Sequence, residues 1–254
     1  MSRIAQLFSM RSEKVIPFLT AGYPDKSYMV KMVLAAEESG ASMVEIGMPF
    51  SDPLADGPVI QRASQVAIEN GVNIKWILET VEEIRASSEI PLVLMGYINP
   101  IIKYGLVKFM KDCQMAGIDG LIIPDLPPEE AEKFVQLAKE NNISPILLVA
   151  PNTSSRRIKI ISDLAGDLIY CVAILGITGS SEYDMGKLAS YLERVKENSS
   201  CPFIVGFGIK TRKDVKKINE LAHGAVVGSA IINAMDGSVS PVDTVKNYIK
   251  SLVK

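Results

Sequence analysis

The sequence has a single histidine, His223, and three scattered cysteines, Cys113, Cys171 and Cys201. One histidine excludes a histidine-rich metal site, and a Ser–His or Cys–His nucleophilic pair would have to use that one residue. His223 comes just before an expected strand, where we expect a solvated or structural role. The cysteines are odd in number and form no Cys-x-x-Cys motif, which favours a reducing, cytoplasmic location.

The chain also lacks a strong charge of either sign and a long apolar run. Its formal net charge is −2 at pH 7, so it has no basic field that would attract nucleic acid. No stretch approaches the roughly 20 apolar residues that a membrane span needs. Residues 1–14 lack the apolar region of a secretion signal. We therefore expect neither a nucleic-acid partner nor a membrane.

The sequence does contain a regular alternation of short apolar runs and longer amphipathic segments, which is typical of repeated βα units. Strands are expected at Val15–Thr20, Met43–Gly47, Pro91–Met95, Gly120–Pro124, Pro145–Val149, Leu168–Val172, Phe203–Gly206 and Ala225–Gly228. Helices are expected at Tyr28–Ser39, Ile60–Glu69, Lys103–Ala116, Pro128–Asn141, Ser155–Leu164, Lys187–Glu197, Thr211–Leu221 and Val242–Val253. An extra helix, Ile74–Ala86, follows the second unit, and a short one, Ile4–Ser9, precedes the first strand.

Eight such units predict one (β/α)8 barrel, the TIM-barrel architecture, which occupies residues 1–254 as a single domain. An open doubly wound sheet is the alternative fold. Local signals set some of the helix boundaries. Prolines and acids at 127–130 predict that a helix opens there, and Thr211 is a plausible N-cap.

A carboxylate lies inside the second expected strand, at Glu45, and the proline-rich loop after it carries Asp52 and Asp56. A buried charge is costly unless it is paired, hydrogen-bonded or protonated. Alternation along the strand puts Met43, Glu45 and Gly47 on one face, and in a barrel a carboxylate favours the interior mouth. The carboxylate therefore either has a structural role, as a cap of a neighbouring element or half of a buried ion pair, or is part of an acid/base site.

Glycine-rich turns follow the last three expected strands, at 176–180, 206–208 and 228–229. Loops after strands seven and eight of these barrels frequently bind phosphate. Glycine allows backbone N–H groups to approach an anion, and a helix N-terminus strengthens the attraction. Ser229 would open a short helix that ends near Asn233.

No expected strand contains a lysine, so a Schiff-base aldolase would lack its nucleophile. With one histidine, a metal-dependent aldolase would lack its usual ligands, and we expect no metal site. Carbon–carbon chemistry would therefore have to use carboxylates, with a tyrosine hydroxyl nearby. Tyr97 and Tyr170 are available for this, although each could instead be a core or rim aromatic.

The segment Val44–Gly57, VEIGMPFSDPLADG, resembles the characteristic motif of tryptophan synthase alpha chains. The resemblance continues through the segments 17–24, 94–100, 124–127, 176–179 and 206–209, and so covers nearly the whole chain. It implies a (β/α)8 barrel that cleaves indole-3-glycerol phosphate to indole and D-glyceraldehyde 3-phosphate in L-tryptophan biosynthesis. It also implies an α2β2 assembly with a pyridoxal-phosphate-dependent β chain, and no cofactor in this chain.

The resemblance further implies roles for individual residues. Glu45 matches the acid/base carboxylate and Asp56 the partner of the indole N–H. The residues implied to bind substrate are Phe18, Leu94, Tyr97, Tyr170 and Thr178, and those implied to bind phosphate are Gly179, Gly208, Gly228 and Ser229. Segments 49–58 and 176–187 would be lids, with Thr178 bonding Asp56 on closure. At 173–175 the chain reads Ala-Ile-Leu, where the family usually has polar residues.

Two other functions remain open at this point. One is another phosphate-binding barrel, such as a sugar-phosphate isomerase of histidine or tryptophan synthesis. The other is a chain that mainly activates a partner through exposed loops such as 53–54 and 125–128.

Overall fold

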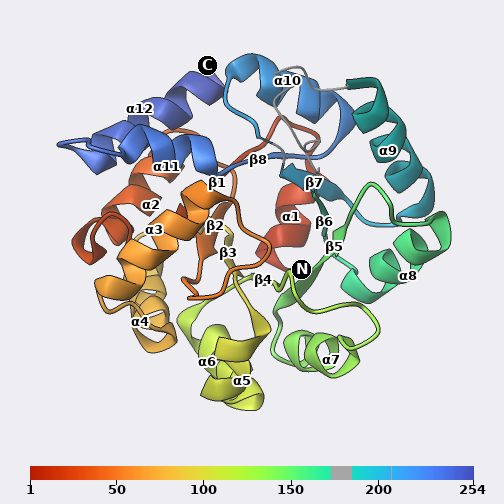
Figure 1. The fold of residues 1–254 in the computed structure, drawn as a ribbon. Helices are drawn as coiled ribbons and strands as arrows, with labels where there is room; N and C mark the ends of the chain where they lie inside the picture. Colours follow the sequence, from red (N-terminus) through yellow and green to blue (C-terminus); the bar gives the residue numbers. More distant parts are fainter. Residues whose placement is uncertain (173–184, 207) are drawn as a thin grey trace.

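Parallel strands form a closed ring at the centre of the molecule (Figure 1). The computed structural model describes residues 1–172, 185–206 and 208–254, and the ring has eight strands within them. They are β1 (Val15–Thr20), β2 (Val44–Gly47), β3 (Leu92–Met95), β4 (Gly120–Ile122), β5 (Ser144–Val149), β6 (Ile169–Val172), β7 (Phe203–Gly206) and β8 (Ala225–Val227). Each strand pairs with the next, and β8 closes on β1. The predicted (β/α)8 barrel is confirmed, and the open sheet is wrong.

Helices surround the ring and cover its outer face, except for the first, which lies near the centre of the ring in this view (Figure 1). They are α1 (Arg3–Ser9), α2 (Met29–Glu38), α3 (Pro58–Glu69), α4 (Ile74–Arg85), α5 (Ile98–Tyr104), α6 (Leu106–Ala116), α7 (Glu132–Glu140), α8 (Ser155–Ala165), α9 (Met185–Asn198), α10 (Arg212–Leu221), α11 (Ser229–Met235) and α12 (Pro241–Val253), with a 3-10 turn, η1, at Lys26–Tyr28. Both predicted extra helices are present, as α1 and α4. Thr211 caps α10 in a reciprocal capping box with Asp214, as its position predicts.

Two predicted helices differ from the structure. The segment 103–116 belongs to two helices, because Gly105 takes a φ of +99° between α5 and α6. The helix predicted from Pro128 begins at Glu132 instead. The preceding residues form turns, in which the Glu130 N–H donates to the Pro127 carbonyl at 3.0 Å. A proline disfavours the helical conformation in the residue before it, so Pro128 keeps Pro127 out of a helical turn.

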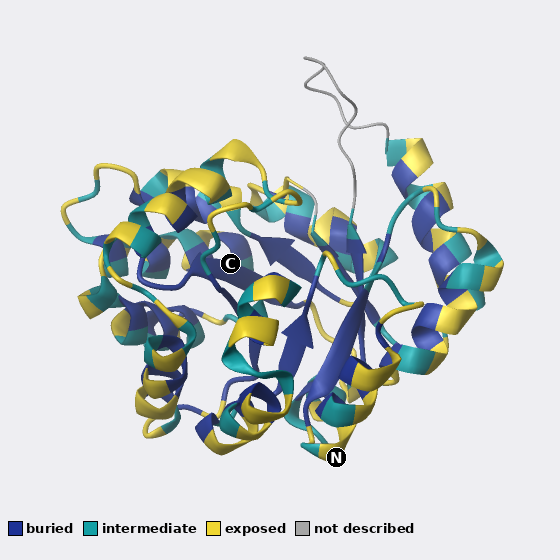
Figure 2. Ribbon diagram, turned by 60° about the horizontal axis from the view of Figure 1, so that its bottom comes forward, coloured by how far each residue is buried: buried dark blue, intermediate teal, exposed yellow. Residues whose placement is uncertain are grey.

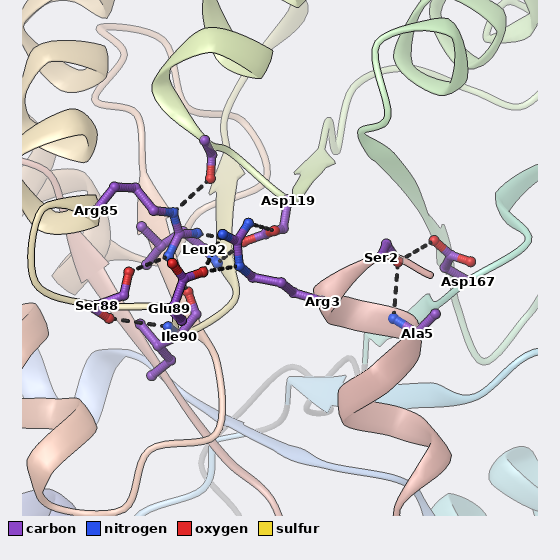
Figure 3. A network of polar contacts seen from close by, with 11 residues as sticks. Ser2, Arg3, Ala5, Arg85, Ser88, Glu89, Ile90, Leu92, Asp119 and Asp167 are labelled. Carbon is purple, nitrogen blue, oxygen red and sulfur yellow. Dashed lines mark hydrogen bonds and ion pairs between the residues drawn. The ribbon is translucent and has the colours of Figure 1, made fainter.

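The short helix α1 closes the amino end of the barrel, near the centre of the ring in Figure 1. Its Ile4 is fully buried, and a side chain on Gly120 would put its Cβ 2.8 Å from the Ile4 Cδ1. Polar contacts hold the helix in place (Figure 3). Arg3 donates to Asp119 at 3.1 Å, and Arg85 donates to the other oxygen of that carboxylate at 2.6 Å. The floor of the barrel is therefore sealed.

Burial follows the layers of the fold (Figure 2). The strands are buried, while the outer faces of the helices are exposed. The cysteines Cys113, Cys171 and Cys201 are free and buried. His223 accepts a hydrogen bond from the Phe203 N–H at 3.2 Å, which is a structural contact. In the part of the chain that the structure describes, no helix is long and apolar enough to cross a membrane.

Candidate active site

Glu45 is a fully buried carboxyl group in β2, and neither of its oxygens has a hydrogen-bond partner. Among the residues that the structure describes, no cation or donor compensates for its lost hydration, and burial raises the pKa of Glu45 to about 8. The ion-pair interpretation of this residue is therefore wrong. At neutral pH the group carries its proton, and it is available as an acid.

The Glu45 side chain points into the barrel. Strands β2 and β6 lie on opposite sides of the ring, so a side chain from one can affect a side chain from the other only through the interior. Burial raises the pKa of Tyr170 in β6 well above its usual value, and the charges of Glu45 and Asp56 raise it further. The Tyr170 hydroxyl lies against β7, where a Cβ on Gly206 would be 2.0 Å from the oxygen.

A pocket opens at the carboxyl ends of β1, β2 and β3. Its lining consists of Phe18, Gly47, Met48, Asp56, Ile60, Ser64, Met95, Gly96, Tyr97 and Pro124. The structure thus brings together three residues that the sequence singled out, Phe18, Asp56 and Tyr97. Helix α3 contributes two further lining residues that the sequence analysis missed, because nothing local indicates that its first turns lie over the mouth.

Phe18 links the carboxylate end of the pocket to the glycine turn after β8. A Cβ on Gly47 would lie 2.3 Å from the tip of the Phe18 ring, so only glycine fits there. A Cβ on Gly228 would lie 3.4 Å from the Phe18 Cβ. Since β1 lies between β2 and β8, one phenylalanine touches both ends of the site. Phe18 therefore lies between the Glu45 strand and the Gly228 turn.

Tyr97 holds Asp56 at the mouth. The Tyr97 hydroxyl accepts a hydrogen bond from the Ala55 N–H at 3.0 Å and is hydrogen-bonded to the Asp56 carboxylate. The centres of the Phe50 and Tyr97 rings lie 5.2 Å apart, so the loop after β2 packs on the Tyr97 ring. Burial raises the pKa of Asp56, and the bond from Tyr97 partly opposes that rise. The tyrosine therefore keeps this carboxylate oriented.

Leu94 does not reach the pocket. In β3 it pairs with Ile46, which puts its side chain on the face opposite Glu45 and Gly47, toward the helices. Its neighbour Met95 pairs with Gly47 and lines the pocket. The sequence analysis missed Met95, although it is the last residue of the expected strand and precedes Tyr97 by only two positions.

The turn after β8 has the form of an anion site. Gly228 is the N-cap of α11, and the Ile231 and Ile232 N–H groups both donate to its carbonyl. The earlier N–H groups of Ser229 and Ala230 have no acceptor within the helix, as at any helix start. Gly208 takes a φ of +45° after β7 and is exposed. Thr178 and Gly179, and most of the predicted lid at 176–187, lie outside the described residues.

A hydrogen bond and an ion pair connect the two sides of the site. The Tyr23 hydroxyl, after β1, donates to Asp236 at the end of α11. Arg62 of α3 pairs with the other oxygen of the same carboxylate. Helix α3 follows the Asp56 loop, and α11 follows Gly228, so this contact fixes the mouth relative to the glycine turn. Among the described residues no three His, Cys, Asp or Glu side chains gather as a metal site would require.

Comparisons with known proteins agree with this geometry. The family model described as "Tryptophan synthase alpha chain" matches residues 4–252. A tryptophan synthase alpha chain from Petrotoga mobilis is 44% identical over 256 residues, which cover 99% of both chains. The solved alpha subunit from Legionella pneumophila superposes with a TM-score of 0.91 at 33% identity, covering 99% of this chain and 97% of that one. A chain from the tryptophan synthase a2b2 complex of Pyrococcus furiosus gives 0.90 at 35% identity, covering 96% and 98%.

Proposed function

Because this chain belongs to the tryptophan synthase alpha chain family, we propose that Glu45 and Asp56 carry out its reaction. That reaction is the cleavage of indole-3-glycerol phosphate in tryptophan biosynthesis, so the chain is an enzyme with lyase activity. The observation that carries the assignment of residues is the buried Glu45 carboxyl group, which has no hydrogen-bond partner within the described part of the chain and a pKa of about 8.

Glu45 acts first as an acid and then as a base. The retro-aldol step needs a proton on the ring carbon that bears the side chain, which turns the indole into a better leaving group. Glu45 is protonated at neutral pH and donates this proton. The resulting carboxylate then takes the proton of the side-chain hydroxyl as the carbon–carbon bond breaks and the aldehyde forms. The proton returns to Glu45, so the group ends the cycle as it began.

Asp56 stabilises the positive charge that develops on the indole nitrogen once the ring carbon is protonated. A fixed anion within hydrogen-bond distance of that N–H lowers the energy of this intermediate more than that of the neutral substrate. Tyr97 orients the Asp56 carboxylate before substrate binds. The two carboxyl groups thus have different roles, because one is buried without partners and the other is hydrogen-bonded at the mouth.

The remaining site residues bind the two ends of the substrate. Phe18, Met95 and Tyr170 form apolar walls for the indole ring. Leu94 supports the strand from behind and has no direct contact with the ring. The phosphate lies at the N-terminus of α11, where backbone N–H groups are free to donate. The residues assigned to it are Gly208, Gly228 and Ser229, with Gly179, while Thr178 bonds Asp56 when the lids at 49–58 and 176–187 close.

The Pyrococcus furiosus relative is described as part of an a2b2 complex, and we extend this assembly to the present chain. Pyridoxal phosphate belongs to the β chain, and this chain's own chemistry needs only its carboxyl groups. A suitable docking surface borders the mouth, where Leu54 is 95% exposed and Ile102 is 61% exposed. A surface groove of about 470 Å³ includes Met48, Pro49 and Pro100. The chain acts as a single domain, residues 1–254, in the cytoplasm.

The decisive test is the Glu45→Gln variant, which keeps the shape of the side chain but removes its ability to donate and accept a proton as an acid and base. We expect indole formation by the purified protein to fall at least about hundredfold, the usual contribution of a positioned acid/base group. Glu83→Gln, an exposed change on α4, is the matched control and should leave the rate unchanged. If Glu45→Gln retains most of the activity, another group transfers the proton.

A further inference from the structure

Few buried side-chain polar atoms lack a hydrogen-bond partner within the described residues. They belong to Thr20, Glu45, Arg194 and Arg212. The two arginines lie on the outer helices α9 and α10, and each makes another polar contact through its guanidinium group. Thr20 and Glu45 have no such contact, and they lie on the adjacent strands β1 and β2. Unsatisfied groups of this kind in a native structure call for an explanation, and a ligand is one.

The Thr20 hydroxyl belongs to the same face of the sheet as the pocket. Thr20 is the last residue of β1 and follows Phe18 by two positions, so the two side chains share a face. Phe18 lines the pocket. Thr20 also pairs with Gly47, one layer closer to the mouth than the pair formed by Phe18 and Glu45. Its side chain is only 1% exposed, and Gly47 beside it has no side chain that could satisfy the hydroxyl.

The order of the strands places Thr20 between the two ends of the site. Strand β1 has β2, with Glu45, on one side and β8, with the Gly228 turn, on the other. The substrate's three-carbon chain carries a hydroxyl beside the indole ring, a second hydroxyl on its middle carbon, and the phosphate at its far end. Glu45 takes the proton of the first hydroxyl, and the α11 turn binds the phosphate. The middle hydroxyl is then left near β1.

We propose that Thr20 is a substrate-binding residue whose hydroxyl bonds the middle hydroxyl of the three-carbon chain. It thereby selects a hydroxylated chain over a deoxygenated one. The inference rests on the proposed function of Glu45 and of the α11 turn. A hydroxyl that is left unpaired in the empty site discriminates strongly, because a ligand that lacks the matching group leaves it unpaired after binding too.

The test compares two ligands on wild-type protein and on Thr20→Val, which keeps the shape of the side chain but removes the hydroxyl. One ligand is indole-3-glycerol phosphate, and the other is the same phosphate ester without the two chain hydroxyls. We expect kcat/KM for the substrate to fall about tenfold to hundredfold, the range for one lost buried hydrogen bond to a ligand. The inhibition constant of the deoxy analogue should change by less than about twofold.

Thr80→Val is the matched control, because the Thr80 hydroxyl is buried but donates to the Trp76 carbonyl within α4. It should affect thermal unfolding and not the ratio between the two ligands, whereas Thr20→Val should leave the unfolding temperature unchanged or raise it. Thr20→Ser should recover most of the lost kcat/KM. An equal loss for substrate and analogue, or no loss for either, would overturn the proposal.

A second measurement needs no variant. Wild-type protein should bind an analogue that lacks only the middle hydroxyl about tenfold or more weakly than the hydroxylated compound. Equal affinity would also overturn the role of Thr20. If wild-type protein releases no indole from the substrate, the proposed function itself fails, and that result is distinct from a failure of the Thr20 assignment.

Discussion

Glu45 is a carboxyl group at a fully buried position without polar partners among the described residues. Its titration should set the pH dependence of the enzyme's activity. Burial raises the pKa of Glu45 to about 8. Below that pH the group holds the proton that it must donate, and above it the proton is lost. We therefore expect kcat/KM to be level near neutral pH and to fall about tenfold for each pH unit well above 8.

The check is a pH profile of kcat/KM for indole release, with Glu83→Gln as a variant that should reproduce the wild-type curve. If kcat/KM stays level well above pH 8, Glu45 does not act as an acid in the rate-determining step. A fall of kcat/KM at low pH would come from Asp56 and not from Glu45. Burial also raises the pKa of Asp56, and this carboxylate must be ionised to stabilise the indole nitrogen.

The site residues differ in how far the sequence could predict them. Glu45 was predictable because a carboxylate interrupts an apolar strand, which is visible without any partner. The choice between Leu94 and Met95 depends on which face of β3 turns inward, and that follows from pairing with β2. The hydrogen bond between Tyr97 and Asp56 joins residues from different βα units, so it depends on how the mouth packs.

At the scale of the elements, α1 should depend on Asp119 for its place under the barrel. This carboxylate is 6% exposed and accepts bonds from Arg3, Arg85 and the Leu92 N–H. Asp119→Ala would leave the Arg85 guanidinium buried without its partner, which typically costs about 3–5 kcal/mol. We expect a loss of unfolding free energy near the lower end of that range, because Arg3 is partly exposed.

Urea unfolding measures this loss, and the exposed pair of Arg157 and Glu129 provides the control. Glu129→Ala should cost less than about 1 kcal/mol, as surface ion pairs usually do. Equal effects of the two substitutions would mean that the Asp119 network adds nothing beyond a surface pair, and that the other contacts of α1, such as those of Ile4, hold it in place.

Element boundaries were predictable where side chains cap the backbone and less so where backbone geometry decides. Thr211 and Asp214 cap α10 through their own side chains, so a local motif was enough. Gly105 could have continued a helix at a modest cost, but it takes a φ of +99° between α5 and α6, which glycine adopts without strain. The segment 127–130 has the composition of a helix start but forms a turn, and α7 begins only at Glu132.

At the scale of the whole molecule, repetition made the fold predictable. Each βα unit has one apolar strand and one amphipathic helix, and eight copies supply enough strands for closure. The closing pair, β1 with β8, joins opposite ends of the chain, and no local signal specifies it. The same closure brings Phe18 between Glu45 and the Gly228 turn, so the site as a single pocket also depends on it.

The last prediction concerns the surface beside the mouth. The Ile98 N–H donates to Asp125 at 3.0 Å, which ties the loop after β4 to the start of α5. Ile102 on that helix is 61% exposed. An aspartate there would put a charge into any apolar interface with a β chain. We expect Ile102→Asp to weaken the complex at least about tenfold and to abolish stimulation of indole formation by the partner at ordinary concentrations.

The matched control is Val239→Asp, which introduces the same charge at a fully exposed apolar residue between α11 and α12. It should bind the β chain as wild-type protein does. Ile102 does not line the pocket, so both variants should cleave substrate alone at the wild-type rate. Titration calorimetry with the β chain and the indole assay together separate the two effects. Normal binding of Ile102→Asp would place the interface on another face, whereas slower cleavage without the partner would mean that α5 helps to shape the site through Tyr97, which directly precedes it.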